Sequence, residues 1–430
     1  MCNQSSKCFK SLLLFLAAVL LVSCSGDDKN ADDNNGGGVI ENSEYNVARF
    51  TIVAIAANNN VSADATYSWN VINAPSDNYS LANASAKEAL FAATEVGVYE
   101  LEVIVNDQGK TRTQKVKVFV NKETKEYKTY IAKVHEFKPA PGQFINDLPA
   151  ANNGDTPERI LGRANTYLAK EAGDLVSLGA FGGYIIFGFD HTIVNVKDKR
   201  DFRILGNAFW AEANPNPDST MRGGSSEGGV IMVSYDKNKN GLPDDEWYEI
   251  EGAGHNMEKT VHNYEITYYK PDPNKIPVPG GSTGTVVFTD MEYIYWKDNQ
   301  GKDGYLAQNN AHNHSLDYWP KWLGDQQTLT FKGTRLPDNA VDESGTGSYF
   351  VQYAFLYGYA DNAPNNDDDS AVDIDWAIDS KGNRVHLPGV DFVKVYNGLN
   401  QQAGWLGETS TEIMGATDLH LLGENIPTRK

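Results

Sequence analysis

Cysteine is scarce in this chain of 430 residues, which contains three, at positions 2, 8 and 24. Because all three precede residue 25, no disulfide can join later segments, and a disulfide-stapled scaffold is excluded. A thiol nucleophile is excluded from the rest of the chain for the same reason. The folded part must therefore be held together by hydrophobic cores, which about 400 residues can supply in two or three domains.

Basic residues are in the minority, with 37 Lys and Arg against 57 Asp and Glu, so the formal net charge is −20. A surface of this sign repels nucleic acid and anionic membranes, and we therefore exclude nucleic acid as a partner. An excess of acidic residues commonly serves only to keep a protein soluble. It also suits divalent cations wherever carboxylates are clustered rather than dispersed.

Two common catalytic signatures are absent, since the chain has neither a Walker-type phosphate loop (GxxxxGK[ST]) nor an HExxH metal helix. His312 and His314 lack a third metal ligand nearby and are typical of a surface loop. His191 and His420 follow strand-like runs and are predicted to be hydrogen-bonded structural residues. We assign no catalytic residue and expect a binding protein rather than an enzyme.

The apolar run at residues 12–22 is too short to cross a bilayer comfortably. Lys7 and Lys10 precede it, and a basic start before a short apolar run is typical of a secretory signal. The sequence LVSC at 21–24 resembles the bacterial lipobox, which implies cleavage before Cys24 and diacylglycerol on its thiol. Residues 1–23 are therefore predicted to be a lipoprotein signal peptide.

Residues 24–38 contain no large apolar residue and end in three glycines, so we predict a flexible tether that follows the lipidated cysteine. Asp27 and Asp28 resemble the signal by which Bacteroidetes place lipoproteins on the outside of the outer membrane. This resemblance implies a lipid-anchored protein on the extracellular side of that membrane.

Strand periodicity dominates residues 39–122. Apolar and polar residues alternate on both sides of the sequence NDQG at 106–109, which is typical of a hairpin turn. Trp69 is the kind of aromatic residue that fills the centre of a two-sheet sandwich. The segment FAATEVGVY at 91–99, with the strand after it, resembles the second half of PKD domains, which implies an immunoglobulin-like β-sandwich acting as a spacer.

Residues 128–430 have little helical periodicity, many aromatic residues and many glycine turns. One helix is predicted, over residues 156–172. β-Branched and aromatic residues favour strands at 184–189, 230–235, 264–269, 328–331, 349–357 and 392–396. We therefore predict a mainly β protein, in which an immunoglobulin-like (PKD-like) β-sandwich is followed by a larger β-sandwich or jelly-roll-like domain that binds a ligand.

The most specific local motif is DKNKNGLPDDE at 236–246. Oxygen-bearing side chains at positions one, three and five, glycine at six and a carboxylate at nine match the first three quarters of a calcium loop. Trp247 replaces the usual Glu at position twelve, and the alternative is a hairpin rich in turn formers. We predict a structural Ca²⁺ site whose ligands are Asp236, Asn238, Asn240, the carbonyl of Leu242, Asp244 and Glu246.

A second acidic group lies in VDIDW at 372–376, where alternation along a strand puts Asp373 and Asp375 on one solvated face. Paired carboxylates also serve in glycoside hydrolysis, which keeps a hydrolase as an alternative function. Tryptophans in or beside turns can line a ligand surface. The candidates for this role are Trp319, Trp322 and Trp405.

Several further segments of the large region resemble the PKD-containing "cell surface protein" lipoproteins of Bacteroides and related Bacteroidetes. They are PAPGQF at 139–144, FGFDHT at 187–192, GNAFW at 206–210, the loop at 236–246, GTRLPDNAVDE at 333–343 and GWLGETSTE at 404–412. The resemblance implies a partner in the outer membrane, such as a TonB-dependent receptor. It carries over no catalytic residue.

Together these features predict a surface-exposed outer-membrane lipoprotein that binds a nutrient ligand for a TonB-dependent uptake system. A corrinoid such as vitamin B12 is the first expected ligand and a glycan the second. A surface glycoside hydrolase, or another hydrolase, is the rival function. An adhesin or structural surface protein without a small ligand is the third.

Overall fold

The computed structural model describes residues 39–57, 61–211 and 221–429. The predicted signal peptide, lipidation site Cys24 and tether therefore lie outside the described residues. Strands dominate the described part of the chain, and the prediction of a mainly β protein is confirmed. Among the described residues, no helix is both long and apolar enough to cross a membrane.

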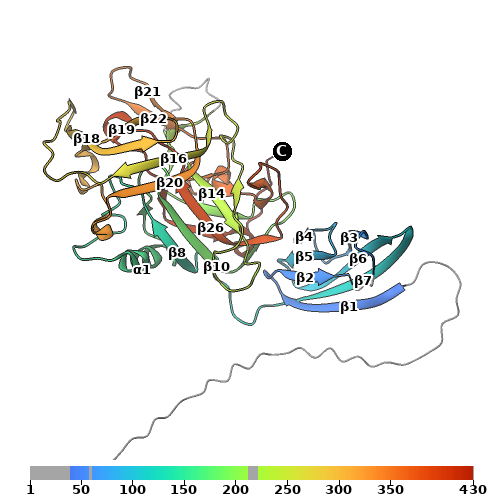
Figure 1. Ribbon diagram of the computed structural model, residues 1–430. Helices are drawn as coiled ribbons and strands as arrows, with labels where there is room; N and C mark the ends of the chain where they lie inside the picture. The colour runs from blue at the N-terminus through green and yellow to red at the C-terminus, as the bar shows by residue number, and fades with distance from the viewer. Residues whose placement is uncertain (1–38, 58–60, 212–220, 430) are drawn as a thin grey trace, which may run out of the picture.

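The N-terminal module is a sandwich of two sheets, with strand orders β1-β7-β6-β3 and β2-β5-β4 (Figure 1). β6 and β7 form the predicted hairpin, turning at Gln108 and Gly109. Trp69 is buried between the sheets beside Phe91 and Tyr99, as expected for a sandwich core. The strands are β1 (Val39–Ala48), β2 (Val53–Ala56), β3 (Thr66–Asn73), β4 (Tyr79–Ala82), β5 (Glu88–Ala93), β6 (Gly97–Asp107) and β7 (Lys110–Asn121).

The large region is built on an antiparallel sheet of seven strands, ordered β25-β15-β14-β26-β10-β8, with β23 also paired to β14. The long strands β10 and β26 form its centre and are rich in β-branched and aromatic residues. The strands are β8 (Lys133–Lys138), β10 (Tyr184–Val194), β14 (Gly229–Ser234), β15 (Tyr248–Ile250), β23 (Tyr359–Ala360), β25 (Ala377–Ile378) and β26 (Gly389–Asn397).

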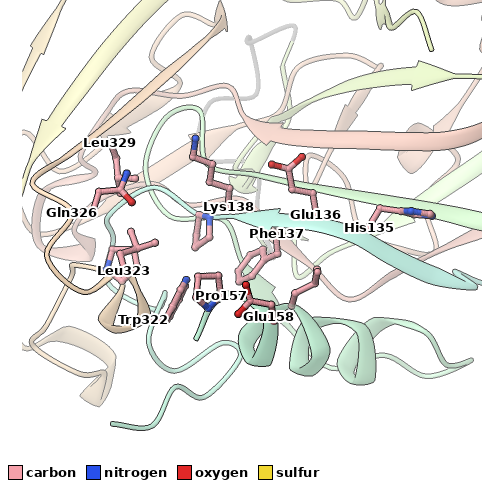
Figure 2. A pocket seen from close by; sticks show the side chains of 13 residues that line it. His135, Glu136, Phe137, Lys138, Pro157, Glu158, Trp322, Leu323, Gln326 and Leu329 are labelled. Carbon is pink, nitrogen blue, oxygen red and sulfur yellow. The ribbon is translucent and has the colours of Figure 1, made fainter. Parts of the chain in front are cut away.

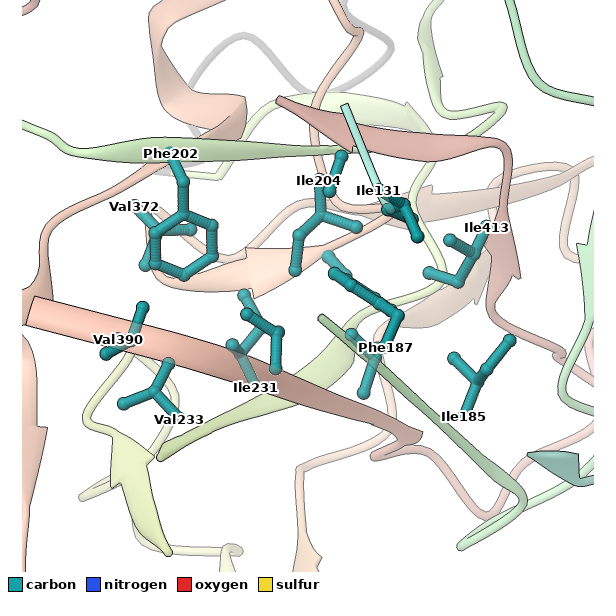
Figure 3. Packing of buried hydrophobic residues seen from close by; sticks show 14 of the residues in the cluster. Ile131, Ile185, Phe187, Phe202, Ile204, Ile231, Val233, Val372, Val390 and Ile413 are labelled. Atoms are coloured by element: carbon teal, nitrogen blue, oxygen red, sulfur yellow. The ribbon is translucent and has the colours of Figure 1, made fainter. Parts of the chain in front are cut away.

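A three-stranded sheet, β24-β11-β28, packs on this large sheet and encloses the main core between them. Figure 3 shows Phe202 and Ile204 of β11 directed toward Ile231, Val233 and Val390 of the large sheet. The three strands are β11 (Phe202–Leu205), β24 (Ala371–Val372) and β28 (Gly415–Asp418).

The remaining strands form three further sheets: β17-β18-β16-β20 with β19 paired to β18, then β12-β13-β22-β21, and β27-β9. Their bounds are β9 (Val176–Ser177), β12 (Phe209–Trp210), β13 (Gly223–Ser225), β16 (Val261–Tyr269), β17 (Ser282–Thr283), β18 (Val286–Asp298), β19 (Asp303–Asn309), β20 (Thr328–Arg335), β21 (Ala340–Asp342), β22 (Phe350–Tyr353) and β27 (Glu412–Ile413).

The predicted helix is present as α1 (Pro157–Leu168) and ends four residues earlier than expected. Thr156 caps its start by accepting a hydrogen bond from Arg159 N, and Pro157 occupies the first position, where no N–H is needed. The described residues also contain a second, short helix and five 3₁₀ turns: α2 (Leu419–Leu422), η1 (Ala311–Asn313), η2 (Lys321–Leu323), η3 (Asp368–Ser370), η4 (Ile374–Trp376) and η5 (Gly404–Leu406).

The prediction of a solvated strand face at residues 372–376 is wrong. β24 ends at Val372, and the Asp373 carboxylate accepts a hydrogen bond from Asp375 N at 2.8 Å, which starts the turn η4. The Asp373 side chain is buried, while Asp375 pairs with His386 at 2.7 Å. An Asp that bonds its own backbone breaks a strand, so alternation alone was an insufficient guide.

The two modules are joined by a small hydrophobic cluster. Phe50 and Ala92 of the N-terminal sandwich pack against Val194 and Val196 of the large region. The backbone N–H of Thr192 also donates to the carbonyl of Phe50 at 3.0 Å. The first sandwich is therefore docked on the large region and is not merely tied to it by the connecting segment.

Candidate functional site

The three tryptophans predicted to line a ligand surface border three separate cavities, of about 510, 300 and 420 Å³. Trp319 and Trp322 are almost fully buried and contribute mainly to hydrophobic clusters. Trp405 is partly exposed, in η5. The structure therefore does not bring the three residues into one site.

The Trp322 cavity is an apolar groove between β8, the start of α1 and η2 (Figure 2). Its Trp322 ring stacks on Phe137 with 6.4 Å between ring centroids, and Pro157 lies beside them. Glu136 and Lys138 lie on one side of the groove, and Glu158 lies on the other, beside Phe137 and Pro157. This groove offers shape and apolar contact but few polar groups to orient a ligand.

The Trp405 cavity combines an aromatic wall with a polar floor, which is the usual composition of a small-molecule site. Residues of strands β12, β13, β22 and β27 and of the turn η5 line it. A side chain at Gly404 would collide with the Phe350 ring, so glycine lets η5, which carries Trp405, approach β22 closely. The aromatic residues of the wall are Phe144, Phe209, His312, Tyr349, Phe350 and Trp405.

Three carboxylates from distant parts of the chain meet at the floor. One oxygen atom each from Glu227, Asp361 and Glu412 lies within 4.8 Å of the other two. Glu227 precedes β14, Asp361 follows β23 and Glu412 begins β27, so the fold alone brings them together. We call this group the carboxylate triad. Glu227 and Glu412 also line the Trp405 cavity.

Asp361 is the most firmly held member of the triad. Its Oδ1 accepts hydrogen bonds from the backbone N–H groups of Asn207 and Ala208, both at 2.9 Å, and its Oδ2 accepts one from Glu412 N at 3.0 Å. A Cβ at Gly206 would collide with this carboxylate, so glycine is required there for the close approach. The backbone therefore fixes the position of the Asp361 carboxylate.

The other two carboxylates are oriented by side chains. Ser410 Oγ donates to Glu412 Oε1 at 2.5 Å, and Gln352 Nε2 donates to Glu227 Oε1 at 3.1 Å. Burial, followed by the negative charge of Glu412, raises the pKa of Asp361 to about 8. The same two causes raise the pKa of Glu227 well above its ordinary value, and burial raises that of Glu412. Without a cation, part of the triad is therefore protonated at neutral pH.

A fourth carboxylate, Glu408, lines the same cavity. Its Oε1 accepts a hydrogen bond from Gln143 N at 2.8 Å, whereas its buried Oε2 has no hydrogen-bond partner. The buried Oε1 of Gln143 is also without a partner. Burial raises the pKa of Glu408 well above its ordinary value. The floor thus offers two buried oxygen atoms without hydrogen-bond partners, which the hydroxyl groups of a ligand can satisfy as donors or acceptors.

The loop predicted to bind calcium joins β14 to β15 and is exposed. Asp236 accepts hydrogen bonds from Asn240 N at 3.0 Å and from Gly241 N at 2.8 Å, while Asp244 accepts them from the amides of Asn238 and Asn240. Four of the six predicted ligand residues, Asp236, Asn238, Asn240 and Asp244, therefore lie together in one hydrogen-bonded network.

Of the other two predicted ligands, Leu242 is joined to that network by its backbone N–H, and Glu246 bonds to Tyr248 instead. Glu246 accepts a hydrogen bond from the Tyr248 hydroxyl at 2.8 Å. The backbone N–H of Leu242 donates to Asn240 Oδ1 at 2.8 Å, and the Leu242 side chain is exposed. An Asx-rich turn and a calcium loop share this arrangement, so the Ca²⁺ site stays a prediction.

His191 and His420 are hydrogen-bonded structural residues, as the sequence predicts. His191 Nε2 pairs with Asp418 at 2.9 Å, and His420 Nε2 pairs with Asp201 at 2.8 Å. The exposed His312 lies in η1 on the wall of the Trp405 cavity, with His314 two residues further along a surface loop. In the part of the chain that the structure describes, neither residue belongs to a cluster of metal-ligating side chains.

Sequence reasoning missed the carboxylate triad. Its members follow no local motif, because they are far apart in the chain and each stands alone among neutral neighbours. One usable signal was the glycine-rich segment GGSSEGG at 223–229, in which a single carboxylate is surrounded by residues that permit close backbone packing. Two further signals were the segments GNAFW at 206–210 and GWLGETSTE at 404–412, because residues of both line the cavity.

No family model matches the chain, and no curated protein matches it. Among solved structures, the chain is similar to a solution structure of the PKD domain from KIAA 1837 protein, with 18% identity, 22% of this chain and 97% of that chain covered, and a TM-score of 0.18. It is also similar to Sidekick-1 immunoglobulin domains 1-5, with 11% identity and a TM-score of 0.20. That match covers 77% of this chain and 81% of the other. Part of the chain therefore has a PKD-like structural match, and these likenesses concern the fold alone.

Proposed function

We propose that this protein is an outer-membrane lipoprotein, anchored through Cys24 and facing the cell exterior, that captures a nutrient in the Trp405 cavity. Its partner would be a TonB-dependent receptor, as the sequence resemblance implies. The observation that supports capture is the pairing of an aromatic wall with unused acceptors on the floor of one cavity. Rings stack on the wall, and donor groups of the ligand bond to the floor.

The cavity favours a glycan over a corrinoid. Its volume of about 420 Å³ is in the range of ordinary small-molecule sites and is much smaller than a whole corrinoid, which could insert only its periphery. Sugar rings offer an apolar face to Phe209, Tyr349 and Trp405, of which the first two are 59% and 48% exposed. Sugar hydroxyls then supply the donors that Gln143 and Glu408 lack.

Replacement of Trp405 by alanine tests this proposal. We expect saturable binding of a glycan, found on a glycan array and measured by isothermal titration, to weaken about tenfold in Trp405→Ala, which corresponds to about 1.4 kcal/mol. Trp247→Ala is the matched control, because Trp247 is also partly buried in a loop but does not line this cavity. The control should bind as the wild type does.

Cyanocobalamin should be titrated in parallel. If the wild type binds cyanocobalamin tightly and Trp405→Ala does not, the ligand of the cavity is a corrinoid and not a glycan. Failure of the wild type to bind any glycan or the corrinoid would overturn capture and leave an adhesin or structural role.

A glycoside hydrolase is the second candidate, because the carboxylate oxygens of Glu227 and Glu412 lie within 4.8 Å of each other. Retaining glycosidases hold their two carboxyl groups about 5–5.5 Å apart, and one of the two must start out protonated. The raised pKa of Glu227 meets the second requirement. New reducing ends from a bound glycan, lost in Glu227→Gln, would favour hydrolysis over capture.

We further propose that the loop at 236–246 holds a structural Ca²⁺ ion. In the presence of calcium, Asp244→Asn should lower the melting temperature, since an ion present at 100 times its Kd stabilises the folded state by about 2.7 kcal/mol. In a chelator the same substitution should have little effect, because Asp244 accepts hydrogen bonds only from exposed amides. Differential scanning calorimetry measures both melting temperatures. An equal decrease in calcium and in chelator would mean that the loop is a turn without a bound ion.

A further inference from the structure

The carboxylate triad carries more negative charge than its surroundings balance. Within the described residues, no Lys, Arg or His forms an ion pair with Glu227, Asp361 or Glu412. Buried carboxylates normally have a cationic or hydrogen-bonding partner, because burial of an unpaired charge is costly. Protonation is one way to relieve this cost, and a bound cation is the other.

Unused oxygen atoms beside the triad point to a ligand. The Glu408 side chain is buried, its Oε2 has no hydrogen-bond partner, and it lines the cavity together with Glu227 and Glu412. Gln143, also buried, leaves its Oε1 unpartnered on the same cavity. When Glu408 is ionised, both of these oxygen atoms are acceptors, and a nearby cation favours the ionised state. A cation with its bound waters or hydroxyls would therefore satisfy them.

The amide of Asn207 can take part as well. When its nitrogen faces Asp361, it donates to the two carboxylate oxygens at 3.1 and 3.2 Å. Rotation of the amide by half a turn presents its oxygen at the same place, where it can serve as a neutral ligand. Amide and carboxylate oxygens are the ligands that hard divalent cations prefer.

The spacing of the triad fits calcium as it stands. Ca²⁺ takes oxygen ligands at about 2.3–2.6 Å, so two ligands on opposite sides of the ion can be about 5 Å apart. The triad oxygens lie within 4.8 Å of one another, which is inside that limit. Three protein carboxylates leave several coordination positions for waters or for ligand hydroxyls that enter from the cavity.

We propose that Glu227, Asp361 and Glu412 bind a Ca²⁺ ion at the floor of the Trp405 cavity, separate from the loop at 236–246. The second part of this inference rests on the proposed function: the ion would also coordinate hydroxyl groups of the captured glycan. This arrangement makes ligand binding calcium-dependent, with the aromatic wall stacking on the sugar and the ion fixing its orientation.

Titration of the purified protein with CaCl₂ alone tests the ion site without any glycan. We expect Glu412→Gln to weaken one binding event at least tenfold, whereas Asp244→Asn, the matched control in the other predicted calcium site, should leave that event unchanged. If Glu412→Gln binds Ca²⁺ as the wild type does, the proposal is overturned.

A second variant covers the case in which Glu412→Gln fails to fold. Glu227 is only partly buried, whereas Asp361 and Glu412 are buried, so Glu227→Gln should disturb the fold least. We expect Glu227→Gln to weaken the same Ca²⁺ binding event at least tenfold. Ca²⁺ binding by folded Glu227→Gln that equals that of the wild type would contradict a triad site.

The two proposals fail separately. Ca²⁺ binding that Glu412→Gln or Glu227→Gln removes, with no glycan bound by any form, would keep the ion site and overturn glycan capture. Glycan binding of equal strength in calcium and in chelator, with Ca²⁺ binding unchanged in both variants, would do the opposite.

Discussion

Replacement of Phe187 by alanine should lower the free energy of unfolding of the large region by about 3–5 kcal/mol, the usual cost of deleting a fully buried aromatic ring. Phe187 lies in β10, is 0% exposed and belongs to the core between the seven-stranded and three-stranded sheets (Figure 3). Urea unfolding followed by tryptophan fluorescence measures the change.

Phe209→Ala is the control for this experiment. Phe209 is 59% exposed, so its removal should change stability by no more than about 0.5 kcal/mol, although it should weaken glycan binding. Similar losses in the two variants would contradict the assignment of the core.

Removal of the Asp418 carboxylate should also cost about 3–5 kcal/mol. Asp418 and His191 form an ion pair at 2.9 Å in which both side chains are 0% exposed. The same carboxylate caps α2 by accepting hydrogen bonds from His420 N at 2.7 Å and Leu421 N at 2.9 Å. Asp418→Ala loses both roles, whereas Asp418→Asn keeps the cap and should lose less. Equal stability of Asp418→Ala and wild type in urea would refute this role.

The pair also sets a pH dependence. Burial alone would lower the pKa of His191, but hydrogen bonds and charges from Asp418 and Asp190 outweigh it and raise the pKa above 6.5. A raised pKa means that folded His191 binds its proton more tightly than unfolded His191. The stabilisation is therefore complete below about pH 6.5 and is lost as pH rises through the folded pKa. Between pH 6 and pH 8, Asp418→Ala should lose less stability than the wild type does.

Local patterns predicted those elements whose backbone depends on local chemistry. The hairpin at 106–109 followed from alternation and turn residues, and the helix α1 followed from the acidic Glu158 in its first turn and from Gly173 as a stop. The strand predicted at 349–357 forms only over β22, because the chain then turns into the bend that carries Asn362 against Phe355. Turn-forming side chains at Asp373 ended another predicted strand for a similar reason.

The candidate site was beyond the reach of sequence patterns, because its chemistry depends on long-range packing. Asp361 acquires its surroundings only when Asn207 and Glu412 are brought beside it by different sheets. Burial, which shifts the pKa of each triad carboxyl, is likewise a property of the assembled fold. Trp405 was predicted as a ligand-facing residue because it stands in a turn, and it borders the cavity.

The parallel pairing of β1 with β7 has a mechanical consequence. Tension from the lipid anchor proposed at Cys24 would enter at the start of β1 and leave toward the large region from the end of β7. Because the two strands are parallel, these opposing pulls would act along the strand axes and load the interstrand hydrogen bonds in shear, all at once, rather than peeling them one by one. Under the proposed anchoring, this pairing would resist drag on the large region.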